Sequence, residues 1–160
     1  MMALNHLRDK AMFTRHIQNK KGAALVEFAI VAMLLFLLTF GIIEFSLMMK
    51  DYLSLNQAAR EGARVAALHA DRATVIQVVR TSAVGISVVQ PSDIGVVPSY
   101  RVNSGTGWGD WIIDKVPPAN AGGEIQIRVK ATYKHPLILG PLFGLGDTKT
   151  LTGDMVWHRE

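Results

Sequence analysis

The stretch that decides the fold is Gly22-Ala-Ala-Leu-Val-Glu-Phe-Ala-Ile-Val-Ala-Met-Leu-Leu-Phe-Leu-Leu-Thr-Phe-Gly-Ile-Ile43. No residue from Phe28 to Ile43 carries a charge. A helix from Ala23 to Ile43 would be about 30 Å long at about 1.5 Å per residue, which matches the hydrocarbon thickness of a bilayer. The stretch therefore predicts a membrane-spanning helix, which we place at residues 23–49.

Charge is distributed unevenly on the two sides of this stretch. The chain of 160 residues has a formal net charge of +4. Residues 1–22 hold five basic residues and one acidic residue, while residues 23–160 hold 12 of each. Because Lys and Arg resist translocation, the amino-terminal flank is expected to stay in the cytoplasm and the carboxy-terminal part to face outward. The neutral remainder of the chain gives no indication of nucleic-acid binding.

Glu27 is the one ionisable side chain between Ala23 and Ile43. A carboxylate in a spanning segment costs on the order of 3 kcal/mol at the helix centre, so its presence near the start of the segment needs a reason. If the chain is cut after Gly22, Ala23 becomes a positively charged amino terminus. Glu27 then lies four residues along, one helical turn away. Cleavage would therefore place a cation and an anion at the same membrane depth.

Three segments resemble the TadE-like family, the minor pilins or pseudopilins of the tight-adherence (Tad/Flp) type IV pilus system. They are Gly22-Ala-Ala-Leu-Val-Glu-Phe-Ala, Phe40-Gly-Ile-Ile-Glu-Phe45 and Ala58-Ala-Arg-Glu-Gly-Ala-Arg64. In this kind of pilin a prepilin peptidase cuts after a glycine, and the fifth mature residue is a glutamate followed by an aromatic residue. The resemblance implies processing between Gly22 and Ala23 and an assembly role for Glu27 and Phe28.

The resemblance also implies a location and a set of partners. It implies a single-pass protein of the bacterial inner membrane with a cytoplasmic amino terminus and a periplasmic domain, and it leaves open incorporation into an extracellular pilus. The implied partners are the prepilin peptidase, other pilins or pseudopilins, and proteins of the Tad assembly platform. Residues 1–22 would be a basic leader that is removed, and we expect them to be largely unstructured or to form a short helix. No cofactor is implied.

Residues 50–85 are expected to be helical and to lie outside the membrane. Small side chains recur there every four residues, at Ala58, Gly62 and Ala66. Such a face lets another backbone approach closely, and the partner is either the helix of a neighbouring subunit or the protein's own globular domain. Both alternatives remain open at this point. Glu61 and Arg64 are spaced for a weak local ion pair.

A second helix and a small sheet are expected to follow. Asp71 is suited to cap a helix from Arg72 to about Ala83. In the β domain, residues 86–160, alternation from Glu124 to Tyr133 predicts a strand with one buried side. Shorter strand signals lie at 86–90, 100–102 and 149–157, with Pro91, Gly95 and Pro98 separating the first two. The expected fold is α+β: a long transmembrane helix continues into an outer helix, which packs against a small antiparallel sheet.

Two features near the expected membrane surface have more than one interpretation. The connection Pro136–Asp147 has too many glycines and prolines for a long helix, yet it is too apolar for a solvated loop. We expect it to pack on the sheet or on the membrane-proximal surface. Glu44 lies beyond the expected end of the hydrocarbon. It is either an interfacial carboxylate in water or, as the resemblance allows, a residue of the assembly.

The remaining candidates lie in the β domain. Trp108 and Trp111 stand in a glycine-rich loop that is suited to binding a sugar or a protein partner, unless their rings close the edge of the core. Asp110 and Asp114 flank Trp111 without the spacing of a calcium loop. The histidines are scattered, with no zinc-protease motif. We therefore predict no metal site.

We interpret the chain as a structural or assembly component, not as an enzyme. One alternative is an uncleaved, signal-anchored periplasmic protein that binds a ligand through the loop of Trp108 and Trp111. The other is a membrane-tethered enzyme, which would require Asp110, Asp114 and either His135 or His158 to converge on one pocket.

Overall fold

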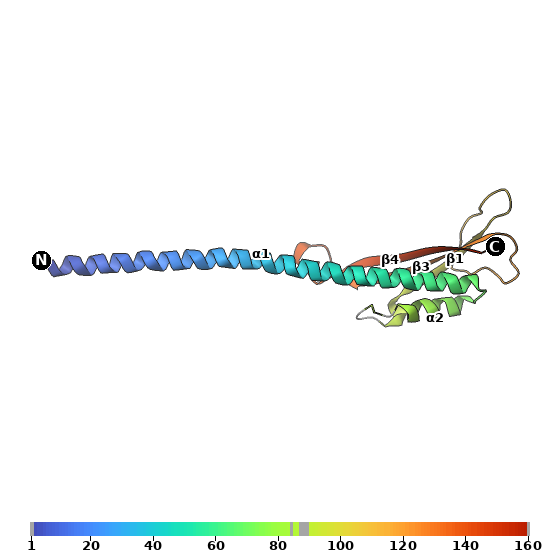
Figure 1. Ribbon diagram of the computed structural model, residues 1–160, viewed down its shortest axis with the longest axis horizontal. Coiled ribbons are helices and arrows are strands. Elements are labelled where there is room, and N and C mark those ends of the chain that lie inside the picture. The colour runs from blue at the N-terminus through green and yellow to red at the C-terminus, as the bar shows by residue number, and fades with distance from the viewer. Residues whose placement is uncertain (1, 84, 87–89, 160) are drawn as a thin grey trace. The chain divides into compact units, whose positions relative to one another are not determined.

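The computed structural model describes residues 2–83, 85–86 and 90–159 (Figure 1). The helices are α1 (Met2–Ala67), α2 (Arg72–Ser82) and two short 3-10 turns, η1 (Pro91–Asp93) and η2 (Pro141–Phe143). The strands are β1 (Gly95–Val102), β2 (Ile112–Ile113), β3 (Ile125–Pro136) and β4 (Thr148–Arg159). The chain forms two compact units, Met1–Ile43 and Glu44–Glu160. The observed architecture is the α+β class that the sequence predicts.

The first unit contains the apolar part of α1. Its large apolar side chains from Leu25 to Ile43 are between 36% and 72% exposed, so this helix segment is not the core of a soluble domain. From Gly22 onward the helix is long and apolar enough to cross a membrane. A helix suits that environment because it satisfies its backbone hydrogen bonds internally. The backbone of residues 2–21 is also helical, where we expected a largely unstructured leader or a short helix.

The second unit is built around the face of small residues on α1. Ala58 and Ala66 are fully buried, and Gly62 lies at the point where α1, α2 and the sheet meet. A Cβ on Gly62 would collide with a methyl group of Val79 on α2 and would lie 3.3 Å from Val129 on β3. The structure therefore favours the second of the two alternatives, in which these small residues pack within the protein's own domain.

The sheet has the strand order β2-β1-β3-β4 and is antiparallel throughout. The central strand β3 alternates as the sequence predicts. Its buried side is formed by Ile125, Ile127, Val129, Ala131, Tyr133 and His135. On β4, Leu151 and Gly153 face the same core, whereas Trp157 at the far end is 39% exposed. The helices cover this side of the sheet, and the opposite side carries polar side chains.

The first strand corrects one sequence expectation. Gly95 and Pro98 were expected to separate short strands, but β1 begins at Gly95 and continues through Pro98 to Val102. The reason is that β2 pairs with β1 only at Ser99 and Tyr100. The edge of β1 at Pro98 is therefore open, which is where a strand tolerates a residue without an amide hydrogen. The candidate strand at 86–90 lies largely outside the described residues.

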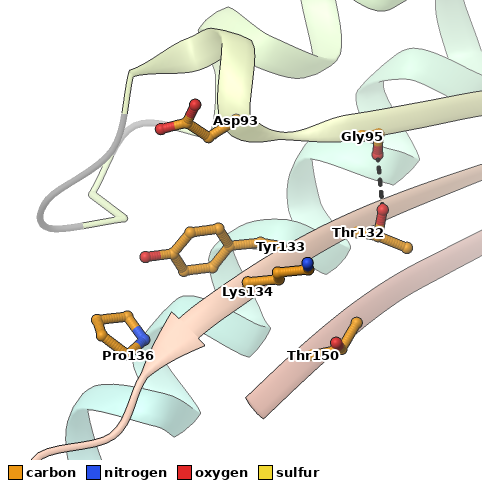
Figure 2. A pocket seen from close by; sticks show the side chains of 7 residues that line it. All are labelled: Asp93, Gly95, Thr132, Tyr133, Lys134, Pro136 and Thr150. Atoms are coloured by element: carbon orange, nitrogen blue, oxygen red, sulfur yellow. Dashed lines mark hydrogen bonds between the residues drawn. The ribbon is translucent and has the colours of Figure 1, made fainter. Parts of the chain in front are cut away.

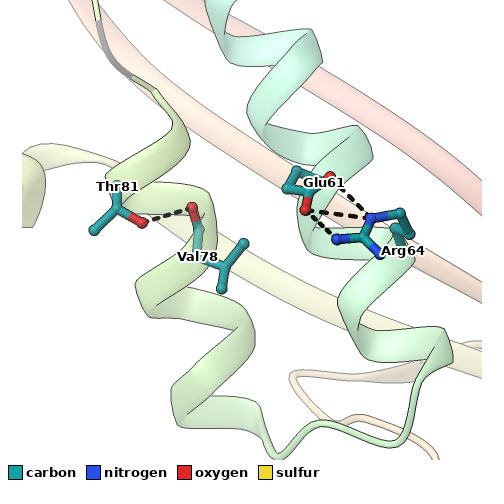
Figure 3. Close-up of polar contacts among 4 residues, drawn as sticks. All are labelled: Glu61, Arg64, Val78 and Thr81. Atoms are coloured by element: carbon teal, nitrogen blue, oxygen red, sulfur yellow. Dashed lines mark hydrogen bonds and ion pairs between the residues drawn. The ribbon is translucent and has the colours of Figure 1, made fainter.

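Helix α2 begins where the sequence predicts. The Asp71 side chain accepts hydrogen bonds from the amides of Ala73 and Thr74, and the helix ends with the Thr81 hydroxyl donating to the carbonyl of Val78. Figure 3 shows this end of α2 beside α1, where Glu61 accepts a hydrogen bond from Arg64 Nε at 3.0 Å. That contact lowers the pKa of Glu61. The pair is solvent-exposed, so it contributes little to stability.

Candidate functional site

The four residues that the resemblance singles out lie on consecutive turns of α1. Gly22, Ala23, Glu27 and Phe28 are all exposed, and Phe28 is 71% exposed. There is free space around Gly22, because a Cβ added there would meet no atom within 4 Å. Ala23 and Glu27 are four residues apart in a continuous helix, so they share one face. In the uncut chain Ala23 carries an ordinary peptide amide; a cut after Gly22 would convert it to an ammonium group.

Glu44 holds the connection between β3 and β4. Its two carboxylate oxygens accept hydrogen bonds from the amides of Ile138 and Leu139, at 2.8 and 3.0 Å. The sequence interpretations of Glu44 were an interfacial carboxylate in water or an assembly residue, and neither anticipated this internal contact. Hydrogen bonds to a charged carboxylate are stronger than those between neutral groups. Glu44 therefore fixes the loop to the helix.

A second polar contact joins α1 to the end of β3. Asp51 on α1 and His135 on β3 are both buried, with 2.8 Å between the carboxylate oxygen Oδ2 and the ring nitrogen Nδ1. The His135 ring also meets Tyr133 edge-on, with ring centroids 6.4 Å apart. Buried polar groups are retained where they have partners, and this pair fixes the end of β3 on the helix.

The two tryptophans cover the polar side of the sheet. The guanidinium of Arg101 lies 5.2 Å from the ring centroid of Trp108 and 4.7 Å from that of Trp111. Arg128 lies 5.7 Å from the Trp111 centroid, and Trp108 meets His158 edge-on at 6.0 Å. The rings are therefore packed against arginines of the outer side rather than closing the edge of the core. Trp108 remains 36% exposed.

An ion pair extends this layer across β3 and β4. Arg128 Nε donates to the two carboxylate oxygens of Asp154 at 2.9 and 3.0 Å, and Arg128 Nη2 donates to Oδ2. The hydrogen bond from Arg128 lowers the pKa of Asp154, and the Coulombic attraction of Arg128 adds to the same effect. Both side chains are about a third exposed, at 37% and 31%, so solvent weakens the interaction.

Asp154→Asn is expected to destabilise the second unit by less than about 1 kcal/mol at neutral pH. A carboxylate with a lowered folded-state pKa stabilises the fold above its unfolded pKa of about 3.9 and loses that contribution as the pH falls through the folded pKa. The deficit of the variant should therefore disappear in acid. Thermal unfolding followed by tryptophan fluorescence measures it, with Asp110→Asn as a control for loss of an exposed carboxylate. An equal deficit at acidic and neutral pH would contradict this account.

Three of the four side chains considered for an enzymatic centre, Asp114, His135 and His158, have other partners. Asp114 pairs with Arg72 on α2 at 2.7 Å, and His135 pairs with Asp51. His158 lies against Trp108 and within 3.2 Å of Gln126 Nε2. Among the described residues no group of three or more His, Asp or Glu side chains is placed to hold a metal ion.

A hollow with a volume of about 610 Å³ lies at the end of β3 (Figure 2). Its lining residues are Asp93, Gly95, Thr132, Tyr133, Lys134, Pro136 and Thr150. The Thr132 hydroxyl donates to the carbonyl of Gly95 at 3.3 Å, which links β3 to β1. Burial raises the pKa of Tyr133, and the charges of Asp51 and Asp93 raise it further. The phenol is thus kept neutral.

One comparison with known proteins gives a family match over part of the chain. Residues 22–64 match the sequence model of the family described as TadE-like protein. The match begins at Gly22 and includes Glu27, Glu44 and Gly62, so it confirms the resemblance over the part of the chain that carries it. No match was found among curated proteins or solved structures.

Proposed function

We propose that this chain is a TadE-like pseudopilin that acts as a structural or assembly component of a tight-adherence pilus used in surface attachment. The observation that carries the proposal is the exposed apolar helix in which Glu27 lies one turn after Ala23. The family match over residues 22–64 supports it. The basic segment before Gly22 suits a cytoplasmic amino terminus, which would leave the sheet domain in the periplasm.

In this proposal a prepilin peptidase cuts between Gly22 and Ala23. The new ammonium group of Ala23 then neutralises Glu27, either in the same helix or in a neighbouring one. Because an unpaired charge in apolar surroundings is penalised, pairing between subunits favours lateral association over isolated helices. The partners would be other pilins or pseudopilins and the Tad assembly platform. This role requires no catalytic group of the protein itself.

Processing is tested by the mass of the mature protein isolated from the membranes of its native host. We expect the amino terminus to be Ala23. The variant Gly22→Val should accumulate with the leader attached, because the peptidase requires glycine before the cut. Gly41→Val is a matched control, since a Cβ meets no atom within 4 Å at either glycine.

Two results would contradict the proposal. Retention of residues 1–22 in a host with an active peptidase would favour the uncleaved, signal-anchored binding protein instead. Normal processing of Gly22→Val would place the cut elsewhere.

A further inference from the structure

The connection between β3 and β4, residues 137–147, exposes an apolar surface on the second unit. It carries no charged side chain before Asp147. Its large exposed side chains are Ile138 (62%), Leu142 (71%), Phe143 (52%) and Leu145 (72%). These fractions lie within the range found for the apolar part of α1. A cluster of this kind on a soluble surface marks a contact with a partner or a membrane.

Most backbone amides of this β3–β4 loop donate hydrogen bonds within the second unit. Its amides donate to acceptors of the second unit at Leu137, Ile138, Leu139, Leu142, Phe143, Gly144 and Leu145. Gly140 allows the loop to close on itself, because a Cβ there would collide with the carbonyl of Gly146 and with Leu137. This pairing lowers the cost of bringing the loop into contact with lipid, because an unpaired backbone group costs several kcal/mol there.

The depth of the loop follows from Glu44. If residues 23–43 span about 30 Å of hydrocarbon, the next residue lies at the level of the lipid headgroups. The Glu44 carboxylate is 2.8 Å from the amide of Ile138 and 3.0 Å from that of Leu139, so the loop begins at the same level. Figure 1 shows the loop between β3 and β4 beside this part of α1.

The surroundings of the loop have the composition of a membrane interface. On α1, Phe45 is 57% exposed and Tyr52 is 43% exposed. Lys134 near the end of β3 and Lys149 near the start of β4 are exposed beside the loop. Aromatic rings and lysines are enriched at the headgroup level, where their apolar parts lie against lipid and their polar ends reach water.

We propose that the β3–β4 loop inserts the side chains of Ile138, Leu142, Phe143 and Leu145 into the bilayer interface, next to the end of the α1 span. The protein then has two contacts with the lipid: one helix that crosses the bilayer and one loop that enters only its surface. The occupant of this apolar surface is the lipid bilayer. The inference rests on α1 spanning the membrane. It adds that the second unit is held against the bilayer. If the protein enters a pilus, as the proposed function allows, the loop has to leave the bilayer when the subunit leaves the membrane.

The test uses the absence of cysteine from the chain. The full-length protein with Leu142→Cys is labelled with an environment-sensitive fluorophore and reconstituted in vesicles of phosphatidylethanolamine and phosphatidylglycerol. Nitroxide-labelled lipids then report contact with the bilayer. Ile113→Cys is a matched control because Ile113 on β2 is similarly exposed, at 61%. Leu34→Cys, within the apolar part of α1, reports the span itself.

We expect a nitroxide near the headgroups to reduce the emission at Leu142 and to leave the emission at Ile113 unchanged. A nitroxide deep in the acyl chains should reduce the emission at Leu34. A second loop variant, Leu145→Cys, should behave as Leu142→Cys does, so a local disturbance by one label is recognised.

Loss of emission at Leu34 without loss at either loop position would overturn the inference and leave the span intact. No loss at Leu34 would overturn the span on which the inference rests. Shielding of the loop from a water-soluble quencher without quenching by lipid would also overturn it, because a second protein copy would then cover the loop.

Discussion

Gly153→Ala is expected to lower the free energy of unfolding of the sheet domain by about 2–3 kcal/mol, the upper part of the range for overpacking in a close-packed core. Gly153 lies in β4 directly against α1. A Cβ added there would stand 2.6 Å from the carbonyl oxygen of Leu55 and 2.9 Å from the amide nitrogen of Asn56. These are backbone atoms of a helix, which cannot rotate away. Either β4 or α1 therefore has to shift, and the close packing at Gly153 is lost.

The same substitution at Gly95 is the control. Gly95 also lies in a strand, and a Cβ there would stand 2.6 Å from the Thr132 hydroxyl. That hydroxyl is the end of a side chain that can rotate, so Gly95→Ala should change stability by less than about 1 kcal/mol. The measurement is thermal unfolding of the full-length protein in detergent. All three tryptophans lie beyond residue 107, so their fluorescence reports the second unit. Equal effects of the two substitutions would contradict the close approach at Gly153.

Local patterns predicted α2, β3 and β4 of the second unit, but not β2 or the full length of β1. The alternation from Glu124 to Tyr133 gave the buried side of β3, because a strand with one wet side has to alternate. Asp71 gave the start of α2, because capping depends on residues two or three positions away. The face of Ala58, Gly62 and Ala66 indicated a close helix contact. It did not identify the partner, since a neighbouring subunit and the protein's own sheet require the same small side chains.

Contacts between distant residues were not predictable from the sequence. Glu44 and Leu139 are separated by 95 positions, and Asp51 and His135 by 84. Neither pair leaves a periodic signal, because each depends on how β3 lies on the helix. The interaction of Arg101 with both tryptophans was not predicted either, because it also depends on contacts between distant residues. For the loop that follows β3, composition predicted packing on the sheet or on the membrane-proximal surface. Its large apolar side chains are exposed, and the contact with Glu44 places them near the end of the proposed span.

Glu27→Gln is expected to abolish pilus formation while leaving insertion and processing intact. Glutamine has nearly the shape of glutamate, so the helix surface is preserved and only the charge is removed. Insertion should become easier, because the carboxylate is the one charge in the apolar segment. The ammonium group of the processed Ala23 would then lack its partner in apolar surroundings, and subunits would lose the attraction that favours association. Pili are counted by electron microscopy of cells that carry only the variant.

Glu61→Gln is the matched control, because it removes a carboxylate from the same helix outside the apolar segment, where Glu61 pairs only weakly with Arg64. It should leave pili unchanged. Three readouts separate the explanations: protein in the membrane fraction, mass of the amino terminus, and number of pili. A Glu27→Gln protein that remains uncut would assign the carboxylate to recognition by the peptidase. A protein that is inserted, cut and normally piliated would exclude charge pairing as the basis of assembly, since Ala23 would then tolerate an unpaired ammonium group.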